Sequence, residues 1–393
     1  MTAKEAAEAL GVNLQTLYVY VGRKGIRSLP IPGTRQRRYW RVDIERLCRK
    51  GAEPAPFIQS SLADESEITF ITTTDLFYRG HSVTDLAQRA SFEETACLLW
   101  GADEELAFAR KAPITPPLFA RIDKLLVKQM DIDRATILLP ILEGVDPRDF
   151  DLSPSGMART GADVLRWLAA LTVHAKGPSS DPIHHFLASH LKRPPTEADL
   201  IRRLLVLVAD HGFEPATVAV RAVARAGVTP WRAVNTGLSV SVGRRSRMSG
   251  LDATDRFLQE IIEGPDAEVP VIRRLREGEP LPGFDPPLYR EGEPVYEKGD
   301  PRARALLQYC NQIYDDTGYR RLKKALALVH EVRDLEPNIA LVCLFIGRKL
   351  GVGSRSMLFH LGRSAGWIAH AIEQHQSGEL EHRRGHYTGP LPV

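Results

Sequence analysis

Apolar residues recur at spacings of three and four through most of the chain after residue 66, and this pattern predicts a mainly helical body. Strand-like alternation is limited to about Ile68–Thr72. The predicted helical segments are Val83–Trp100, Gly161–Val173, Glu197–Asp210, Ala216–Ala226, Pro230–Val242, Asp252–Ile262, Arg302–Tyr314, Arg320–Arg333 and Ile339–Leu350. No strand leads through a glycine-rich loop into a helix, so a nucleotide-binding fold is not indicated.

The first 50 residues predict a separate small helical unit. Thr2 and Glu5 have the spacing of a capping box, and a helix is expected from Ala3 to Leu10. Asn13 is expected to cap a second helix, with Leu14, Leu17 and Val21 facing inward. A third helix is expected near residue 42, after a Pro-rich segment and an arginine run. Two short helices joined by a tight glycine turn have the helix-turn-helix layout.

Charge separates this head from the rest of the chain. Residues 1–50 carry a net +7, whereas the remainder of the 393-residue chain carries −4, so only the head is expected to meet a polyanion. Residues 51–66 contain Pro, Ser and acidic residues without periodicity, which predicts a linker.

Composition narrows the class of protein. The four cysteines are far apart and form no CxxC pair, which argues against a zinc site or a disulfide framework and favours a reducing cytoplasm. No apolar run is long enough for a membrane span, and the N-terminus lacks the apolar stretch of a signal peptide. We expect a cytoplasmic protein with no metal and no resident cofactor.

The head resembles the winged helix-turn-helix of the MerR and excisionase type, on the phrase TAKEAAEALGV at residues 2–12 and the arginine run ending in Arg-Tyr. The resemblance implies that the second helix enters the DNA major groove and that wing arginines hold phosphates. The implied DNA-binding residues are Gln15, Thr16, Tyr18, Arg23, Lys24, Arg35, Arg37 and Arg38. The alternative is a small helical docking module with a solvated basic face.

The body, residues 67–393, resembles citrate synthase from end to end. The motifs that carry the resemblance are YRGHSVTDLA at 78–87, SFEETA at 91–96, ADHGFE at 209–214, GFDPPLYREGEPVYEKGDPRA at 283–303, RSAGWIAH at 363–370 and YTG at 387–389. They imply a mainly all-α citrate-synthase fold, with a large helical domain and a small subdomain at roughly 250–345, that dimerises through its helices.

The resemblance also implies a substrate-holding set. Citrate synthases join acetyl-CoA to oxaloacetate, with a carboxylate as base, two histidines as polarising groups, and arginines and a further histidine holding the oxaloacetate carboxylates. The matching carboxylate-binding residues here are His211, Arg302, Arg363 and Arg384. Arginine suits this role because its planar fork pairs with a carboxylate through two hydrogen bonds.

The catalytic positions are changed. The first histidine aligns with Ser246, or with Arg247 if a gap is placed earlier, and the second aligns with Pro286 or with Glu293. The base of the family's P-N-V-D-F motif is Ala340, whose methyl group cannot accept a proton. The loop glycines after the first histidine are Arg247 and Met248, which would crowd a CoA thioester.

These patterns favour a citrate-synthase-like protein without the catalytic set, which senses a di- or tricarboxylate or a CoA thioester and binds DNA. It would form a homodimer. Two alternatives remain: an active or weakly active citrate synthase, and an inactive subunit that pairs with an intact paralogue in a heterodimer.

Overall fold

The computed structural model describes residues 2–10, 12–14, 16–17, 28–30, 37–39, 65–108, 111–243, 251–284, 296, 298–352 and 356–377. The chain divides into two compact units, Met1–Asp64 and Glu65–Val393, which are described separately below. In the described part of the chain, no helix is long and apolar enough to cross a membrane.

In the first unit, the predicted capping box begins helix α1 (Ala3–Ala9). The Thr2 backbone N–H donates to Glu5 Oε2 at 2.8 Å, and the Glu5 N–H donates to Thr2 Oγ1 at 3.3 Å. A small core of Ala6, Ala7, Leu17 and Tyr39 is buried. Leu14, which was expected to face inward, is instead 44% exposed. Leu17 is buried as expected, and Val21 lies outside the described residues.

Two short strands complete the described part of this unit. Strand β1 (Ser28–Pro30) pairs antiparallel with β2 (Arg37–Tyr39), and Ser28 lies opposite Tyr39. Strand β2 also contacts α1, so the buried Tyr39 ring joins the ribbon to the helix. Residue 13 accepts from the Thr16 N–H at 2.8 Å, as expected of an N-cap asparagine.

The body is helical, as the sequence patterns predict, with one small sheet at its start. Its strands β3 (Thr69–Ile71), β4 (Leu76–Tyr78) and β5 (His81–Ser82) form an antiparallel sheet in the order β3-β4-β5. Its helical elements are α4 (Val83–Arg89), α5 (Phe92–Trp100), α6 (Glu104–Ala107), α7 (Phe119–Leu125), α8 (Asp131–Leu142), η2 (Pro147–Phe150), α9 (Pro154–Thr172), α10 (Ile183–His190), α11 (Pro195–Leu207), α12 (Pro215–Ala224), α13 (Pro230–Ser241), α14 (Leu251–Glu263), α15 (Val269–Glu277), α16 (Pro301–Ile313), α17 (Thr317–Arg333), α18 (Ile339–Leu350) and α19 (Met357–Gln376).

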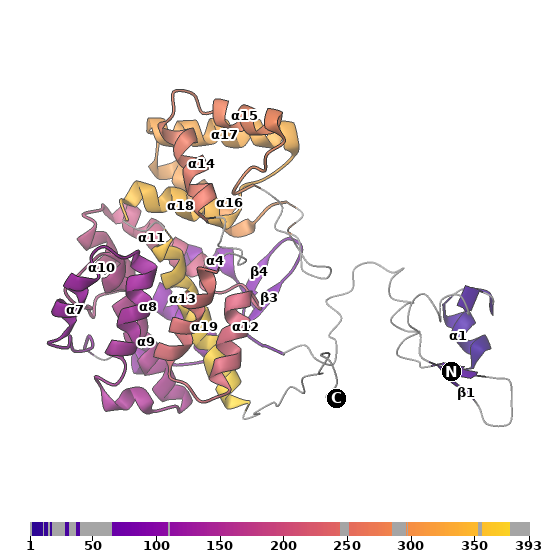
Figure 1. The fold of residues 1–393 in the computed structure, drawn as a ribbon, viewed down its shortest axis with the longest axis horizontal. Coiled ribbons are helices and arrows are strands. Elements are labelled where there is room, and N and C mark those ends of the chain that lie inside the picture. The colour runs from indigo at the N-terminus through magenta and orange to yellow at the C-terminus, as the bar shows by residue number, and fades with distance from the viewer. Residues whose placement is uncertain are drawn as a thin grey trace, which may run out of the picture. The chain divides into compact units, whose positions relative to one another are not determined.

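Helix α19 is the centre of the larger group of helices, and it contacts α5, α9, α11, α12 and α13 (Figure 1). Small residues let its neighbours come close. A Cβ on Gly237 of α13 would lie 2.5 Å from the Trp367 ring, and one on Gly362 would lie 2.5 Å from Val208. One turn later, the Gly366 N–H donates to the Ala209 carbonyl at 2.9 Å. The segment after α11 is therefore held directly against α19.

Helices α14 to α18 form a second group, whose colour runs from salmon at α14 to yellow at α18 in Figure 1. They pack around buried aromatic rings, including Phe257, Phe284, Tyr319 and Phe345. Helix α16 contacts α18 within this group and also α4 and α11 of the larger group. The N-terminus of α16 therefore lies where residues from both groups can meet.

Candidate anion-binding site

His211 lies in the turn between α11 and α12, where Gly212 has a φ of +66° that favours glycine. Its Nε2 is 3.1 Å from the Tyr296 hydroxyl, and its Nδ1 is 3.4 Å from Glu214 Oε1. Burial and the nearby Arg302 lower the pKa of His211. A neutral imidazole that donates from Nδ1 to Glu214 leaves Nε2 to accept the Tyr296 proton.

Arg302 is at the start of α16 and is only 3% exposed. Its Nε and Nη2 donate to the two oxygens of Asp300 at 3.0 and 2.7 Å, and Asp300 also caps the helix by accepting from the Arg302 backbone N–H. Burial alone would raise the pKa of Asp300, but the opposing effects, led by the charge and hydrogen bonds of Arg302, together outweigh it and lower that pKa. The buried Nη1 of Arg302 has no hydrogen-bond partner among the described residues.

Arg363 approaches from α19 and is 1% exposed. Its Nε donates to the Val208 carbonyl at 3.0 Å, and its Nη1 donates to Glu214 Oε2 at 3.1 Å. Burial alone would raise the pKa of Glu214, but Arg363 and the His211 contact outweigh it and lower the pKa to about 2. The remaining nitrogen, Nη2, is buried without a hydrogen-bond partner in the described part of the chain.

These groups form one electrostatic cluster. The charges of both Arg302 and Arg363 act on His211, Glu214, Tyr78 and Cys343. Three of the carboxylate-binding residues predicted from the sequence, His211, Arg302 and Arg363, therefore come together, while Arg384 lies outside the described residues. Two buried guanidinium nitrogens without partners are donors that an anion can satisfy.

A chain of hydrogen bonds connects the His211 turn to the start of the body. The buried Asp210 carboxylate accepts from the Gly212 N–H at 2.8 Å and lies 3.4 Å from His370 Nε2. His370 Nδ1 is 3.2 Å from Arg221 Nη1, which also bonds Glu373. The other Glu373 oxygen accepts from the backbone N–H of residue 67 at 2.8 Å. This chain, which we call the support chain, joins the site turn to the first residues of the body.

Sequence reasoning missed several members of the site. Tyr78, Glu214, Tyr296 and Asp300 all lie inside the motifs quoted above, but the resemblance was not used to assign them a role, and only Asp300, before Pro-Arg, has the local signal of an N-cap. The Tyr78 hydroxyl donates to the Asp210 carbonyl at 3.0 Å and accepts from the Asp210 N–H at 2.9 Å. Only the fold brings residues 78, 214, 296 and 300 to one place.

Of the changed catalytic positions, only Ala340 is among the described residues. Ala340 lies in the first turn of α18 and is partly buried, after Asn338, whose side chain accepts from the Leu341 N–H at 3.1 Å. Cys343, one turn further along, is within reach of the charges of Arg302 and Arg363. Ala340 therefore lies on the same helix as Cys343, one turn before this contact with the cluster. Ser246 and Glu293 lie outside the described residues, as do Arg247 and Pro286.

Few of the predicted DNA-binding residues are described. Thr16 donates its hydroxyl to Asn13 Oδ1 at 2.9 Å, which fixes that side chain locally. Arg37 and Arg38 are in strand β2, and Arg37 is exposed. The others, Gln15, Tyr18, Arg23, Lys24 and Arg35, lie outside the described residues.

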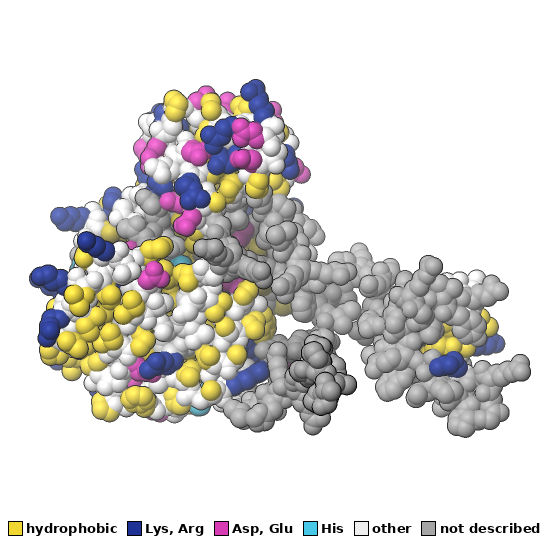
Figure 2. Space-filling model, in the orientation of Figure 1, with side chains coloured by type: hydrophobic (Ala, Val, Ile, Leu, Met, Phe, Trp, Pro, Cys, Tyr) yellow, Lys and Arg dark blue, Asp and Glu magenta, His cyan; other side chains and the backbone are white. Residues whose placement is uncertain are grey.

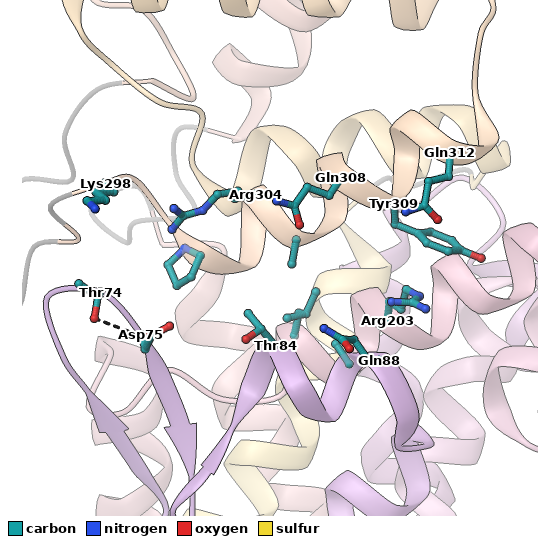
Figure 3. A pocket seen from close by; sticks show the side chains of 14 residues that line it. Thr74, Asp75, Thr84, Gln88, Arg203, Lys298, Arg304, Gln308, Tyr309 and Gln312 are labelled. Carbon is teal, nitrogen blue, oxygen red and sulfur yellow. Dashed lines mark hydrogen bonds between the residues drawn. The ribbon is translucent and has the colours of Figure 1, made fainter.

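A separate pocket of about 780 Å³ lies along the opposite side of α16 (Figure 3). The side chains of Arg304, Gln308 and Gln312 point into it from α16, and Thr84 and Gln88 face them from α4. The turn between β3 and β4 closes one end. This pocket is lined by none of His211, Arg302 and Arg363, so the anion-binding cluster is distinct from it.

Comparison with known proteins gives a consistent result. A family described as "Citrate synthase, C-terminal domain" matches residues 58–384. "Citrate synthase 2" of Bacillus subtilis is 25% identical over 365 residues, which cover 85% of this chain and 95% of that protein. The crystal structure of citrate synthase from Pyrobaculum aerophilum has a TM-score of 0.68 at 17% identity, covering 93% of this chain and 96% of that one. The ternary complex of citrate synthase from Thermoplasma acidophilum with carboxymethyl coenzyme A and oxaloacetate has a TM-score of 0.67 at 20% identity, covering 85% and 96%.

Proposed function

Because the chain belongs to the citrate synthase family, we propose that it binds a carboxylate ligand and has lost the condensation reaction. One observation carries the proposal. Arg302 and Arg363 are both almost fully buried, and each keeps one guanidinium nitrogen without a hydrogen-bond partner among the described residues. A buried donor without a partner costs free energy, and a bound carboxylate would remove that cost at both arginines.

The loss of catalysis rests on the changed positions. Proton abstraction needs a base within hydrogen-bond reach of the substrate, and Ala340 offers only a methyl group there. The positions of the two histidines align with Ser246 or Arg247 and with Pro286 or Glu293, and none of these is a histidine. Groups that act as one catalytic unit do not contribute additively, so no single remaining residue is expected to restore turnover.

The test is turnover with acetyl-CoA and oxaloacetate, followed by release of free thiol, alongside the thermal unfolding midpoint with and without carboxylates. We expect no thiol release but a raised midpoint. Thiol release near the rate of ordinary family members would overturn the proposal and favour an active citrate synthase. If no carboxylate raises the unfolding midpoint, the proposal that the chain binds a carboxylate is wrong.

We further assign a regulatory role to the head, residues 1–50, joined through residues 51–66 to the body. Its net charge of +7, its capped first helix and its arginine-bearing ribbon support binding to DNA. The experiment is selection of bound sequences from random duplexes with the full chain, followed by binding measured against salt. Loss of affinity with rising salt, and weaker binding by an R37A/R38A variant, are expected. Absence of DNA binding would favour a partner subunit of an intact paralogue.

A homodimer is part of the same proposal. Large apolar side chains are exposed on and around α7, α8 and η2, and Figure 2 shows hydrophobic side chains gathered on this face of the body. They include Leu125 at 79%, Val127 at 70%, Met130 at 61%, Ile137 at 43% and Phe150 at 61% exposure. Gathered exposed apolar side chains are typical of interaction sites. A two-fold dimer would present two heads and recognise a palindromic DNA site, in the cytoplasm where the cysteines stay reduced.

A further inference from the structure

We infer that the pocket along α16 is a second ligand-binding site, and that its ligand is a phosphorylated sugar or polyol. This site is separate from the anion-binding cluster and does not depend on the function proposed for that cluster. The pocket has a volume of about 780 Å³, which lies within the range usual for small-molecule sites. Its walls come from α4, α11, α16 and the turn between β3 and β4 (Figure 3).

Lys298 and Arg304 supply the positive charge at one end of this pocket (Figure 3). Both residues are exposed, and neither side chain forms an ion pair with another residue in the described part of the chain. A smaller pocket of about 360 Å³ is also lined by Lys298 and Arg304, so these two cations belong to both hollows. A phosphate ester with nearly two negative charges would be compensated by an ammonium and a guanidinium group.

The carboxylates around these two cations leave their charge available. Asp75 is the one carboxylate among the described residues that line the larger pocket, and it accepts from the Thr74 hydroxyl at 2.9 Å. Asp300 and Glu336 line the smaller pocket, but Asp300 is bonded to Arg302 and Glu336 lies 2.9 Å from His330 Nδ1. An added anion therefore meets cations that no carboxylate already holds.

Uncharged polar side chains line the middle of the larger pocket. Gln308 and Gln312 follow Arg304 along α16 at intervals of four residues. Thr84 and Gln88 face them from α4 with the same interval. Residues four apart lie on one face of a helix, so each helix turns a polar stripe toward the pocket. A glutamine amide both donates and accepts, which suits the hydroxyl groups of a sugar or polyol.

The far end of the pocket does not favour a nucleotide base. Tyr309 is the aromatic side chain that lines it, and the Arg203 guanidinium carbon lies 4.2 Å from the centre of its ring. Arg203 is itself held by Asp199, with Nε 2.7 Å from Oδ2. One face of the ring is therefore already occupied by a fixed cation. Hydrogen-bonding groups along the walls, rather than a free stacking surface, point to a hydroxylated ligand.

The experiment is calorimetric titration of the full chain with D-glucose 6-phosphate, D-fructose 6-phosphate, D-ribose 5-phosphate and glycerol 3-phosphate. The comparison ligands are D-glucose, inorganic phosphate, AMP and coenzyme A. We expect at least one of the first four to bind at least about tenfold more tightly than every comparison ligand. The reason is that only a hydroxylated phosphate uses both the two cations and the amide side chains.

Variants test which side chains bind the ligand. Arg304→Gln removes one cation that has no ion pair to lose among the described residues, and should weaken the bound sugar or polyol phosphate at least about tenfold. Gln308→Ala should weaken it by about threefold to tenfold and leave the affinity for inorganic phosphate unchanged. Arg320→Gln, at a 63% exposed arginine on α17, is the matched control and should bind as the wild type does.

Arg363→Lys separates this site from the anion-binding cluster, and it should bind the sugar or polyol phosphate as the wild type does. Binding lost in Arg363→Lys but kept in Arg304→Gln would place the phosphate in the cluster and overturn the inference. Inorganic phosphate that binds as tightly as all four organic phosphates would show a site for charge alone. Tighter binding of AMP or coenzyme A would show a nucleotide site instead. If none of the four binds to a chain that unfolds cooperatively, the inference is wrong.

Discussion

Arg302 holds both carboxylate oxygens of Asp300, the residue two positions before it, while Asp300 caps the helix on which Arg302 lies. The pair is almost closed to solvent, with side chains 4% and 10% exposed. Pro301 between them adds no N–H that would need a partner, as is usual at the first position of a helix. This local arrangement fixes the direction of an anion-binding arginine before any ligand arrives.

Substitution of Asp300 tests how much this pair stabilises the fold. Asp300→Asn keeps a capping side chain but leaves the buried Arg302 charge without its partner, so we expect a loss of about 3–5 kcal/mol in unfolding free energy. The control is Asp316→Asn, which caps α17 and pairs with Lys349 but is 43% exposed, and should cost about 1 kcal/mol or less. Urea unfolding measures both. Equal effects would mean that the Asp300 pair is energetically no different from a surface pair.

Substitution of Arg363 tests ligand binding. Lysine replaces the three separate nitrogens that reach Val208, Glu214 and a ligand by a single nitrogen, so Arg363→Lys should abolish the rise in unfolding midpoint that a carboxylate gives the wild type. At a hundredfold excess over the dissociation constant, that rise corresponds to about 2.7 kcal/mol. Arg304→Lys, an exposed arginine on the opposite side of α16, should keep the wild-type rise. A rise preserved in Arg363→Lys would place the ligand elsewhere.

The unfolding free energy should depend on pH below 6.5 because of a buried histidine. Burial lowers the pKa of His360 from 6.5 to about 4, although its bond to the Ser356 carbonyl opposes the shift. As pH falls below 6.5, the unfolded chain takes up this proton before the native state does. The unfolding free energy should therefore fall between pH 6.5 and 4, by about 3 kcal/mol from this group. Above pH 6.5 the group contributes no slope.

His360→Asn keeps a donor for Ser356 and removes the titration, so its unfolding free energy should depend less steeply on pH in that window. His81→Asn, at an exposed histidine, is the control and should keep the wild-type slope. Urea unfolding at half-unit pH intervals measures the slope. A His360→Asn slope equal to that of the wild type would assign the acid sensitivity to other groups.

The apolar surface of α7, α8 and η2 predicts the oligomeric state. Ile137→Glu places a charge on the exposed side of α8, and should convert a dimer to a monomer in sedimentation velocity without loss of helical content. The control is Val332→Glu on α17, where the side chain is also about half exposed, at 52%. A wild-type monomer, or an Ile137→Glu dimer of unchanged affinity, would contradict the proposed interface.

Periodicity predicted the long amphipathic helices of the body but not the breaks between helices. The segment predicted as one helix, 83–100, is two, because Ser91 and Glu94 form a capping box that begins α5 after the extended residue Ala90. Helices α6, α7, α8, α10, α15 and the central α19 were not identified. In α7 and α8 much of the apolar surface faces outward, so the usual inside–outside pattern is weak there.

The site was predictable only where the resemblance assigned a role to a residue. Arg302, Arg363 and His211 come together from three distant segments, as the resemblance to the family implied. Their internal partners were not predicted: Tyr296 meets His211 through tertiary packing, and Glu214, three residues after His211, had been given no role. The head gives a smaller example, since Leu14 and Leu17 have the same helical pattern but only Leu17 is buried.

The support chain has a consequence for local dynamics. Glu373 holds the backbone N–H of Glu67 and bonds Arg221, and the contacts continue through His370 and Asp210 to the His211 turn. Local opening of the first residues of the body and opening of the site turn therefore break the same network. A carboxylate that stabilises the turn should slow hydrogen exchange of the amide of Glu67, measured by mass spectrometry, and Arg221→Met should cancel that slowing. Glu67 lies at the start of the body, so a ligand at the anion-binding cluster is expected to change hydrogen exchange there as well as at the site turn.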